Sequence, residues 1–415
     1  MTIWGGFKMT IQLNMIQSIG LAVIFLLIGK AVKNNVPLFS KYAIPSPVIG
    51  GLIFSIMHMI LRQSNIALFE FDTTLQTFFQ IMFFCTVGFN ASLKMLKIGG
   101  KQILIFLLIS TVFAFLQNVL AVGLAKVVGI NPLIALLTAS SALTGGHGTS
   151  AAVAPSIEAL GFPEAMTVAL TAATFGLIAG SFLGSPMANR LIIKNDLVNK
   201  KKNNPSEDVD FDLSIVETKK TTLDTNKISM AFFQILIAMA IGTYLTDALN
   251  TFVGQWVNGV TFPAYIGAML VAAVIRNISD NTTLFKAPLE EIEVVGEVSL
   301  NLFLGMALIT LKLWHLVDLA LPMLILLLAQ CIMMYLYGMF VSYPLMGKNY
   351  DSAVIVAGLT GFAMGSTSNA MANMNSVTEK YLYSRTAFFI VPIVGSLFID
   401  FINIGIIYGF IGFLS

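Results

Sequence analysis

Two glycine-rich segments with hydroxyl and amide side chains carry the residue types best suited to binding chemistry. The first is TGGHGTS at 144–150, and the second is GFAMGSTSNA at 361–370. Glycine lets the backbone turn sharply and approach a ligand closely. Amides at the start of a half-helix attract carboxylates, whereas carbonyl, Ser, Thr and Asn oxygens suit a hard cation. Each segment can therefore serve a cation and a carboxylate together.

A lone carboxylate in the last apolar segment is a further candidate. Asp400 lies about midway through the apolar run 387–414, and Asn403 follows three residues later on the same helical face. A carboxylate at that depth is costly and normally faces a partner or a cavity. We expect the pair to hold an ammonium group or a sodium ion. Pairing of Asp400 with a helix neighbour is the structural alternative.

Other polar residues in apolar runs are weaker candidates for a binding site. Asn90 offers a neutral oxygen that could complete a sodium shell or cap a helix end. His147 invites a proton-relay interpretation, but we favour a structural hydrogen-bond donor. Gln117, Asn118 and Gln330 are expected to form interhelical hydrogen bonds outside the site.

The elements that position these residues are expected to be membrane-spanning helices. Of 415 residues, 57% are hydrophobic and 11% charged, and the mean hydropathy is +0.85. A span needs about 20 mostly apolar residues. Such stretches predict ten spans, near 13–29, 44–61, 74–92, 102–125, 165–184, 228–249, 261–275, 294–311, 318–343 and 387–411.

Two further segments, 132–153 and 350–373, begin apolar and then turn into Gly, Ser, Thr and Asn. Irregular backbone at membrane depth survives only where protein or a water-filled cavity satisfies it, so both are predicted to be re-entrant loops. Close helix packing is the alternative use of their glycines. Packing alone does not require Gly, Thr and Ser in register at both segments.

The distribution of basic residues predicts the orientation. With an external N-terminus, 19 of the 23 basic residues fall on the cytoplasmic side, and Lys8, Arg62, Lys126 and Lys312 fall outside. This agrees with the positive-inside rule and places both termini outside. The first loop then enters from outside and the second from inside.

The chain is expected to divide into two inverted halves, 1–194 and 228–415, joined by a solvated cytoplasmic linker at 195–227. Landmarks repeat at an offset of 218 positions: LKML at 93–96 precedes LKLW at 311–314, GIN at 129–131 precedes GKN at 347–349, and TS at 149–150 precedes TS at 367–368. Five helices per half is an odd number, so the second half must be inverted. Inverted repeats are typical of transporters.

Several motifs resemble those of the bacterial sodium/glutamate symporters. They are TGGHGT at 144–149, LKLWHLVDLALPML at 311–324, LMGKNYDSAV at 345–354, ANM at 372–374 and FIDFIN at 398–403. The resemblance extends over nearly the whole chain from IPSP at 44–47. The family pattern GFGxGxTPxA differs at two places, where this chain has Ala363 for a Gly and Ser368 for the Pro.

The resemblance implies an inner-membrane homodimer that takes up L-glutamate with sodium. It also implies that the two loops meet at mid-membrane and that a mobile core slides against a dimerising scaffold. We expect no enzyme activity, no cofactor besides sodium as the coupling ion, and no nucleic-acid partner. The partners are glutamate, sodium and the lipid bilayer.

The hypothesis assigns substrate contacts to both loops and the last helix: Gly145, Gly146, His147, Gly148, Thr149, Gly365, Ser366, Thr367, Ser368, Asn369, Asp400 and Asn403. It assigns sodium contacts to neutral oxygens: Asn90, Thr144, Ser150 and Asn373.

The sequence argues against three other functions. A citrate-type di- or tricarboxylate carrier usually wants an intramembrane Arg or Lys, and no such cation lies mid-span in the sequence. A passive channel would show uptake without sodium dependence, and two dead-ended loops argue against it. An intramembrane enzyme would need a nucleophile with a general base or a metal set, and the sequence pattern offers neither.

Overall fold

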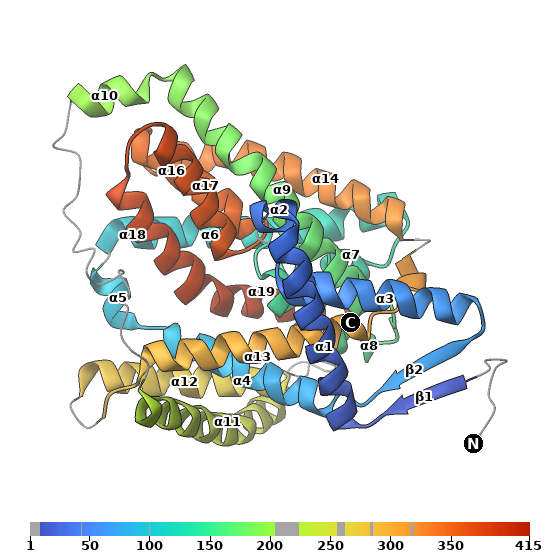
Figure 1. Ribbon diagram of the computed structural model, residues 1–415. Helices are drawn as coiled ribbons and strands as arrows, with labels where there is room; N and C mark the ends of the chain where they lie inside the picture. The colour runs from blue at the N-terminus through green and yellow to red at the C-terminus, as the bar shows by residue number, and fades with distance from the viewer. Residues whose placement is uncertain are drawn as a thin grey trace.

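The computed structural model describes residues 9–42, 44–98, 100–203, 224–254, 262–282, 285–316 and 319–415. Helices dominate this part of the chain, and they form two bundles (Figure 1).

The first bundle lies along the lower and right side of Figure 1. Its helices are α1 (Met15–Asn35), α3 (Ser46–Gln63), α4 (Thr74–Asn90), α11 (Thr225–Gly254), α12 (Ala264–Asn281) and α13 (Leu289–Ile309). Helix α4 packs between α12 and α13, and α13 also packs on α3. The outer helices α1 and α11 complete the bundle by packing on α3 and α12.

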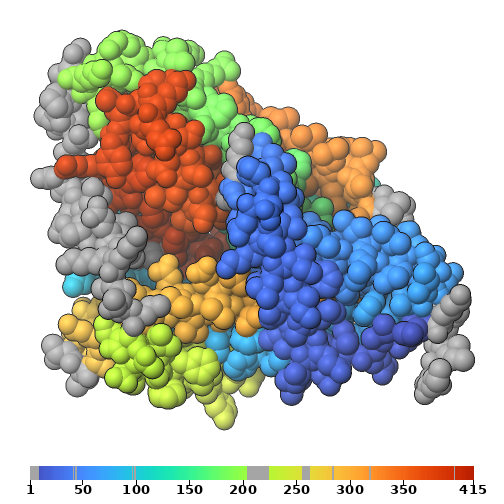
Figure 2. All heavy atoms as spheres, in the orientation of Figure 1, coloured from blue at the N-terminus to red at the C-terminus, as the bar shows by residue number. Residues whose placement is uncertain are grey.

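The second bundle surrounds the long helix α9 (Ala165–Lys194), which packs on α8, α16 and α17. Its other helices are α6 (Gly100–Val128), α7 (Pro132–Leu136), α8 (Gly146–Glu158), α14 (Ala320–Tyr337), α16 (Tyr350–Ala363), α17 (Thr367–Lys380), α18 (Arg385–Ile393) and α19 (Ile399–Leu414). The space-filling view shows α1 running across the front of the molecule, between the red α16–α17 pair and the blue α3 (Figure 2).

Short segments connect these helices. They are α2 (Pro37–Lys41), α5 (Leu93–Ile98), α10 (Leu197–Asn203), the 3-10 turn η3 (Leu313–Leu316), the π-helical turns η4 (Gly338–Ser342) and η5 (Val394–Phe398), and α15 (Tyr343–Leu345).

Two helix hairpins correspond to the segments with glycine-rich tips. In the first, α7 leads through a turn at 137–145 into α8, and in the second α16 leads through 364–366 into α17. Both begin with an asparagine cap. Asn131 accepts from the Leu133 amide at 2.8 Å, and Asn349 accepts from the Ser352 amide at 2.9 Å. Such caps satisfy helix donors that have no intrahelical partner.

Seven described helices are long and apolar enough to cross a membrane, and the bent pair α18–α19 makes an eighth. The two halves of that pair meet at 42° through the π-helical turn η5. Helices stand at all ten positions predicted as spans, but α3 and α12, of 18 residues each, are not among these eight. Both carry polar residues near their C-terminal ends, including Arg62 in α3 and Arg276 in α12.

The purely helical expectation missed a small sheet. Strands β1 (Met9–Leu13) and β2 (Ala67–Phe71) pair in parallel, with Met9 opposite Ala67 and Leu13 opposite Phe71. Each strand has five residues, and three helices, α1, α2 and α3, separate them along the chain. A pattern this short beside strongly apolar helices gives little strand signal.

The predicted linker at 195–227 begins with a helix. Helix α10 occupies its first part, and Lys201 forms a 2.8 Å ion pair with Asp351 at the start of α16. The side chains are 14% and 7% exposed, so this end of the linker is packed on the second hairpin. The middle of the linker, 204–223, lies outside the described residues.

Glycines let the outer helices of the first bundle approach their neighbours closely. A Cβ atom on Gly50 of α3 would overlap the carbonyl oxygen of Phe25 in α1. Likewise, a Cβ on Gly267 of α12 would overlap the carbonyl oxygen of Gly242 in α11. Small residues permit this backbone contact where a membrane offers little hydrophobic driving force between helices.

We expect Gly50→Ala to lower the thermal stability of the purified protein in detergent, because the added methyl group must push α1 away from α3. Overpacking of this kind costs about 1–3 kcal/mol. The matched control is Gly20→Ala in α1, where nothing lies within 4 Å of the added atom. Equal melting temperatures for both variants would show that the α1–α3 contact is not tight.

Candidate functional site

The tips of the two hairpins touch each other. A Cβ atom on Gly146, whose φ is +64°, would lie 2.7 Å from the carbonyl oxygen of Gly365. Both the positive φ and the close approach require glycine. The glycines that the sequence singled out therefore bring two segments, more than 200 positions apart in sequence, into one place.

Gln117 of α6 connects the two tips. Its Oε1 accepts from the Thr144 hydroxyl at 2.7 Å, and its Nε2 donates to the carbonyl oxygen of Ala363 at 2.9 Å. The Gln117 carbonyl accepts from Gln330 Nε2 at 2.8 Å. Sequence reasoning gave Gln117 an interhelical role and missed its position. From the sequence, an amide in an apolar helix is expected to form hydrogen bonds, but the sequence does not tell which groups the amide faces.

Asn403 reaches the first hairpin from α19. Its Nδ2 donates to the Ser140 carbonyl at 3.0 Å, and its Oδ1 is buried without a hydrogen-bond partner. Asn118 holds the same turn by donating to the Ser140 hydroxyl at 2.7 Å. A buried oxygen without a hydrogen-bond partner costs free energy. A cation or an ammonium group bound to the Asn403 oxygen would remove that cost.

Asp400 lies about one helical turn before Asn403. Its side chain is partly exposed and has no hydrogen bond or ion pair with any described residue. The structural alternative, an Asp400 paired with a helix neighbour, finds no support among these residues.

Two other side chains of the first tip, those of His147 and Ser150, are partnered, whereas the Thr149 hydroxyl has no hydrogen bond with a described residue. His147 Nε2 lies 3.0 Å from the Thr174 hydroxyl, which fits a structural role. The Ser150 hydroxyl donates to the Ser141 carbonyl at 3.3 Å. Gly145 packs tightly against the Thr149 side chain.

Gly148 faces the first bundle. A Cβ on it would lie 3.1 Å from Phe83 of α4 and 3.5 Å from Leu300 of α13. Two apolar side chains of the first bundle therefore cover the first tip.

The second tip is fixed by its hydroxyl groups. The Ser366 hydroxyl caps α17 by accepting from the Asn369 amide at 3.2 Å. Thr367 donates to the carbonyl oxygen of Gly395 at 3.1 Å, which ties the tip to the π-helical turn η5. Ser368 is exposed and has no hydrogen bond with a described residue.

Asn369 and Asn373 hold α17 against α9. Asn369 accepts from the Ser181 hydroxyl at 2.6 Å and donates to the Leu177 carbonyl at 2.8 Å. Asn373 donates to the Gly180 carbonyl at 3.0 Å. These contacts place both side chains in the hairpin framework, with the Asn369 amide using both its oxygen and its nitrogen.

Asn90 lies apart from the tips. It ends α4, seven residues beyond Phe83, which is about 10 Å of helix axis. Two residues on, Ser92 donates to Asp280 near the end of α12, so this end of α4 faces α12. No hydrogen bond between described residues joins Asn90 to either tip.

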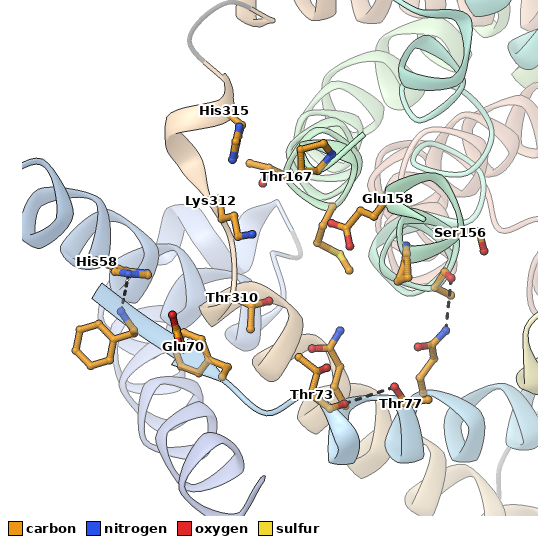
Figure 3. A pocket seen from close by; sticks show the side chains of 18 of the residues that line it. His58, Glu70, Thr73, Thr77, Ser156, Glu158, Thr167, Thr310, Lys312 and His315 are labelled. Atoms are coloured by element: carbon orange, nitrogen blue, oxygen red, sulfur yellow. Dashed lines mark hydrogen bonds between the residues drawn. The ribbon is translucent and has the colours of Figure 1, made fainter. Parts of the chain in front are cut away.

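A cavity of about 910 Å³ opens between the two bundles on the side where α8 ends (Figure 3). The first bundle lines it with α3, α4 and the strand β2, and the second bundle lines it with α8 and α9. The Nε2 atom of Gln80 in α4 donates a hydrogen bond to the carbonyl oxygen of Ala152 in α8 at 3.5 Å. Ala152 is one helical turn from Gly148, so the cavity reaches close to the first tip.

Comparison with known proteins places this architecture in a family. Residues 11–383 match the sodium/glutamate symporter family. The sodium/glutamate symporter of Escherichia coli K12 is 37% identical over 395 residues, which cover 94% of this chain and 96% of the relative. That of Haemophilus influenzae is 34% identical over 391 residues, covering 93% and 94%.

These similarities span both bundles and both hairpins, and they confirm the resemblance inferred from the motifs. The family is one of transporters, so the expectation that the chain is not an enzyme is also confirmed. The chain belongs to the sodium/glutamate symporter family.

Proposed function

We propose that this protein carries L-glutamate into the cell together with sodium, and that both bind where the hairpin tips meet. The contact between Gly146 and Gly365 is the observation on which the proposal depends, because it makes one site from two segments. The helices α8 and α17 start at these tips, and their first amides suit the carboxylates of the substrate. The Asn403 oxygen and the Asp400 carboxylate suit its ammonium group or sodium.

An inverted repeat of ten spans and two re-entrant hairpins accounts for the helix bounds. Shifted by 218 positions, α3 has the bounds of α12, and α4 falls within α13. The caps Asn131 and Asn349 are separated by the same offset. We assign the halves to 1–194 and 228–415, with the linker at 195–227 between them.

The position of the cavity supports the proposed orientation. Positive-inside counting puts the C-terminal ends of α3, α8 and α13 and the start of α4 outside, and all four regions contribute to the cavity. We therefore propose that the cavity opens to the exterior of a bacterial inner membrane, that both termini are external, and that α10 is cytoplasmic.

An elevator-like movement suits the separation into two bundles. Both hairpins and α19 belong to the second bundle, so that bundle could move with its ligands as one body. The first bundle would be the fixed scaffold, and its Phe83 and Leu300 would slide past the first tip. The outer helix α1 exposes large apolar residues such as Ile24 and Leu27, as a lipid-facing or dimer-forming helix does. A homodimer through this scaffold is part of the proposal.

Radiolabelled L-glutamate should accumulate in proteoliposomes of the purified protein under an inward sodium gradient and fail to accumulate when potassium replaces sodium. Excess unlabelled glutamate should compete, and excess citrate should not. Accumulation without sodium would overturn the coupling, and competition by citrate alone would favour a tricarboxylate carrier.

Asp400→Asn and Asn403→Ala should each lower sodium-driven uptake at least tenfold, a loss of about 1.4 kcal/mol or more of binding or transition-state stabilisation. The reason is that each removes an oxygen ligand with no described protein partner. Asp247→Asn on the exposed surface of α11 is the control and should keep normal uptake. Normal uptake by both site variants would remove Asp400 and Asn403 from the site.

Gln117→Leu should abolish most uptake while the protein still folds, because it breaks the hydrogen bonds to Thr144 and Ala363 and leaves both tips without their common partner. Unsatisfied buried groups cost about 1–3 kcal/mol each. Gln102→Leu, the same substitution near the start of α6, is the control, since Gln102 has no hydrogen bond with a described residue. Equal uptake by the two variants would show that Gln117 does not position the tips.

A further inference from the structure

The cavity between the bundles contains two opposite charges that face each other without pairing. Lys312, just beyond the end of α13, and Glu158, the last residue of α8, point toward one another across it (Figure 3). No ion pair within 4.0 Å joins them or links either to another described residue. Lys312 belongs to the proposed scaffold bundle, and Glu158 belongs to the proposed mobile bundle.

The other charged groups of the cavity are engaged elsewhere. The Arg62 guanidinium stacks 4.2 Å from the ring centre of Trp314. Glu70 accepts from Gln12 of β1 at 3.1 Å. His58 Nε2 accepts from the Phe69 amide at 3.1 Å, which leaves that nitrogen unable to donate to a ligand.

His315 also lines the cavity, and burial together with Lys312 lowers its pKa, so it favours the neutral form. Lys312 is therefore the cation of this cavity best placed to receive a carboxylate.

Glu158 and Gln76 provide acceptors on the opposite side. Burial raises the pKa of Glu158. A hydrogen bond from the Met166 amide and the charge of Lys312 offset only part of this rise. A cation bound beside Glu158 would relieve that cost. Gln76 of α4 is 7% exposed, lines the same cavity, and has a buried Oε1 without a hydrogen-bond partner.

We propose that this cavity is a second, outer binding site for the zwitterionic amino acid, with Lys312 receiving a carboxylate and Glu158 and Gln76 receiving the ammonium group. The inference rests on the proposed function. The ligand would sit between the two bundles, about one helical turn from the first tip at the Gln80–Ala152 contact. The site would raise the local substrate concentration beside the transport site and so act on the apparent affinity, with little effect on turnover.

The test is the initial rate of sodium-driven uptake against external glutamate for the wild type, Lys312→Gln and Glu158→Gln. We expect KM to rise about tenfold in each variant, the effect of one lost charge-assisted hydrogen bond, with the maximal rate within about twofold of the wild type. Lys126→Gln is the control, because Lys126 is an exposed lysine on the same predicted side that does not line the cavity.

High ionic strength separates direct contact from long-range attraction. At about 0.5 M choline chloride the Debye length is about 4 Å, so steering from a distance is largely screened. The KM ratio between variant and wild type should persist there. A ratio that falls to one would overturn the binding site and leave steering as the explanation.

Two further outcomes keep the inference separate from the proposed function. An active wild type with unchanged KM in both variants would overturn the outer site alone, whereas a wild type without sodium-driven uptake would overturn the proposed function as well. If a Gln variant loses its maximal rate, Lys312→Arg and Glu158→Asp retain the charges. Recovery of both kinetic constants in these two variants supports the site, and failure to recover them overturns it.

Discussion

The structure depends on satisfying irregular backbone in the middle of an apolar protein. The hairpin turns at 137–145 and 364–366 break the helical hydrogen-bond pattern, and their carbonyl groups need other donors. Side-chain amides supply donors at both places: Asn403 donates to the Ser140 carbonyl in the first turn, and Gln117 donates to the Ala363 carbonyl at the end of α16, just before the second turn. Without them the tips could not stay irregular away from water.

This requirement explains why most of the described amide side chains that are buried lie around the tips. An amide both donates and accepts hydrogen bonds. One side chain such as Gln117 can therefore join a hydroxyl of one hairpin to a carbonyl of the other. A lysine or arginine would donate equally well but would add a charge to a buried place, where an unpaired charge is costly. The tips and their described hydrogen-bond partners accordingly carry neutral groups, and Asp400 nearby is the acidic exception.

Sequence reasoning found the parts that follow from local pattern. Apolar length gave helix positions, Gly and Asn marked the hairpins, and the depth of Asp400 marked it as costly. It missed what depends on three-dimensional neighbours. Gln117 and Asn403 look alike in sequence as amides within apolar helices, and only packing shows that the first bridges both tips while the second leaves one oxygen free. The cavity was also missed, because Lys312 and Glu158 come from separate halves.

The charge balance of the site gives a physical reason for sodium coupling. Glutamate carries a net charge of −1 at neutral pH, and an ionised Asp400 adds another negative charge. No lysine or arginine is a described hydrogen-bond partner of the tips, so the protein itself leaves this charge uncompensated there. In the proposed movement, carrying such a site through the membrane would be expensive, and sodium held by neutral oxygens would reduce its charge. In the proposed site, which is built from amides and hydroxyls, the cation would therefore be a condition for moving the anion.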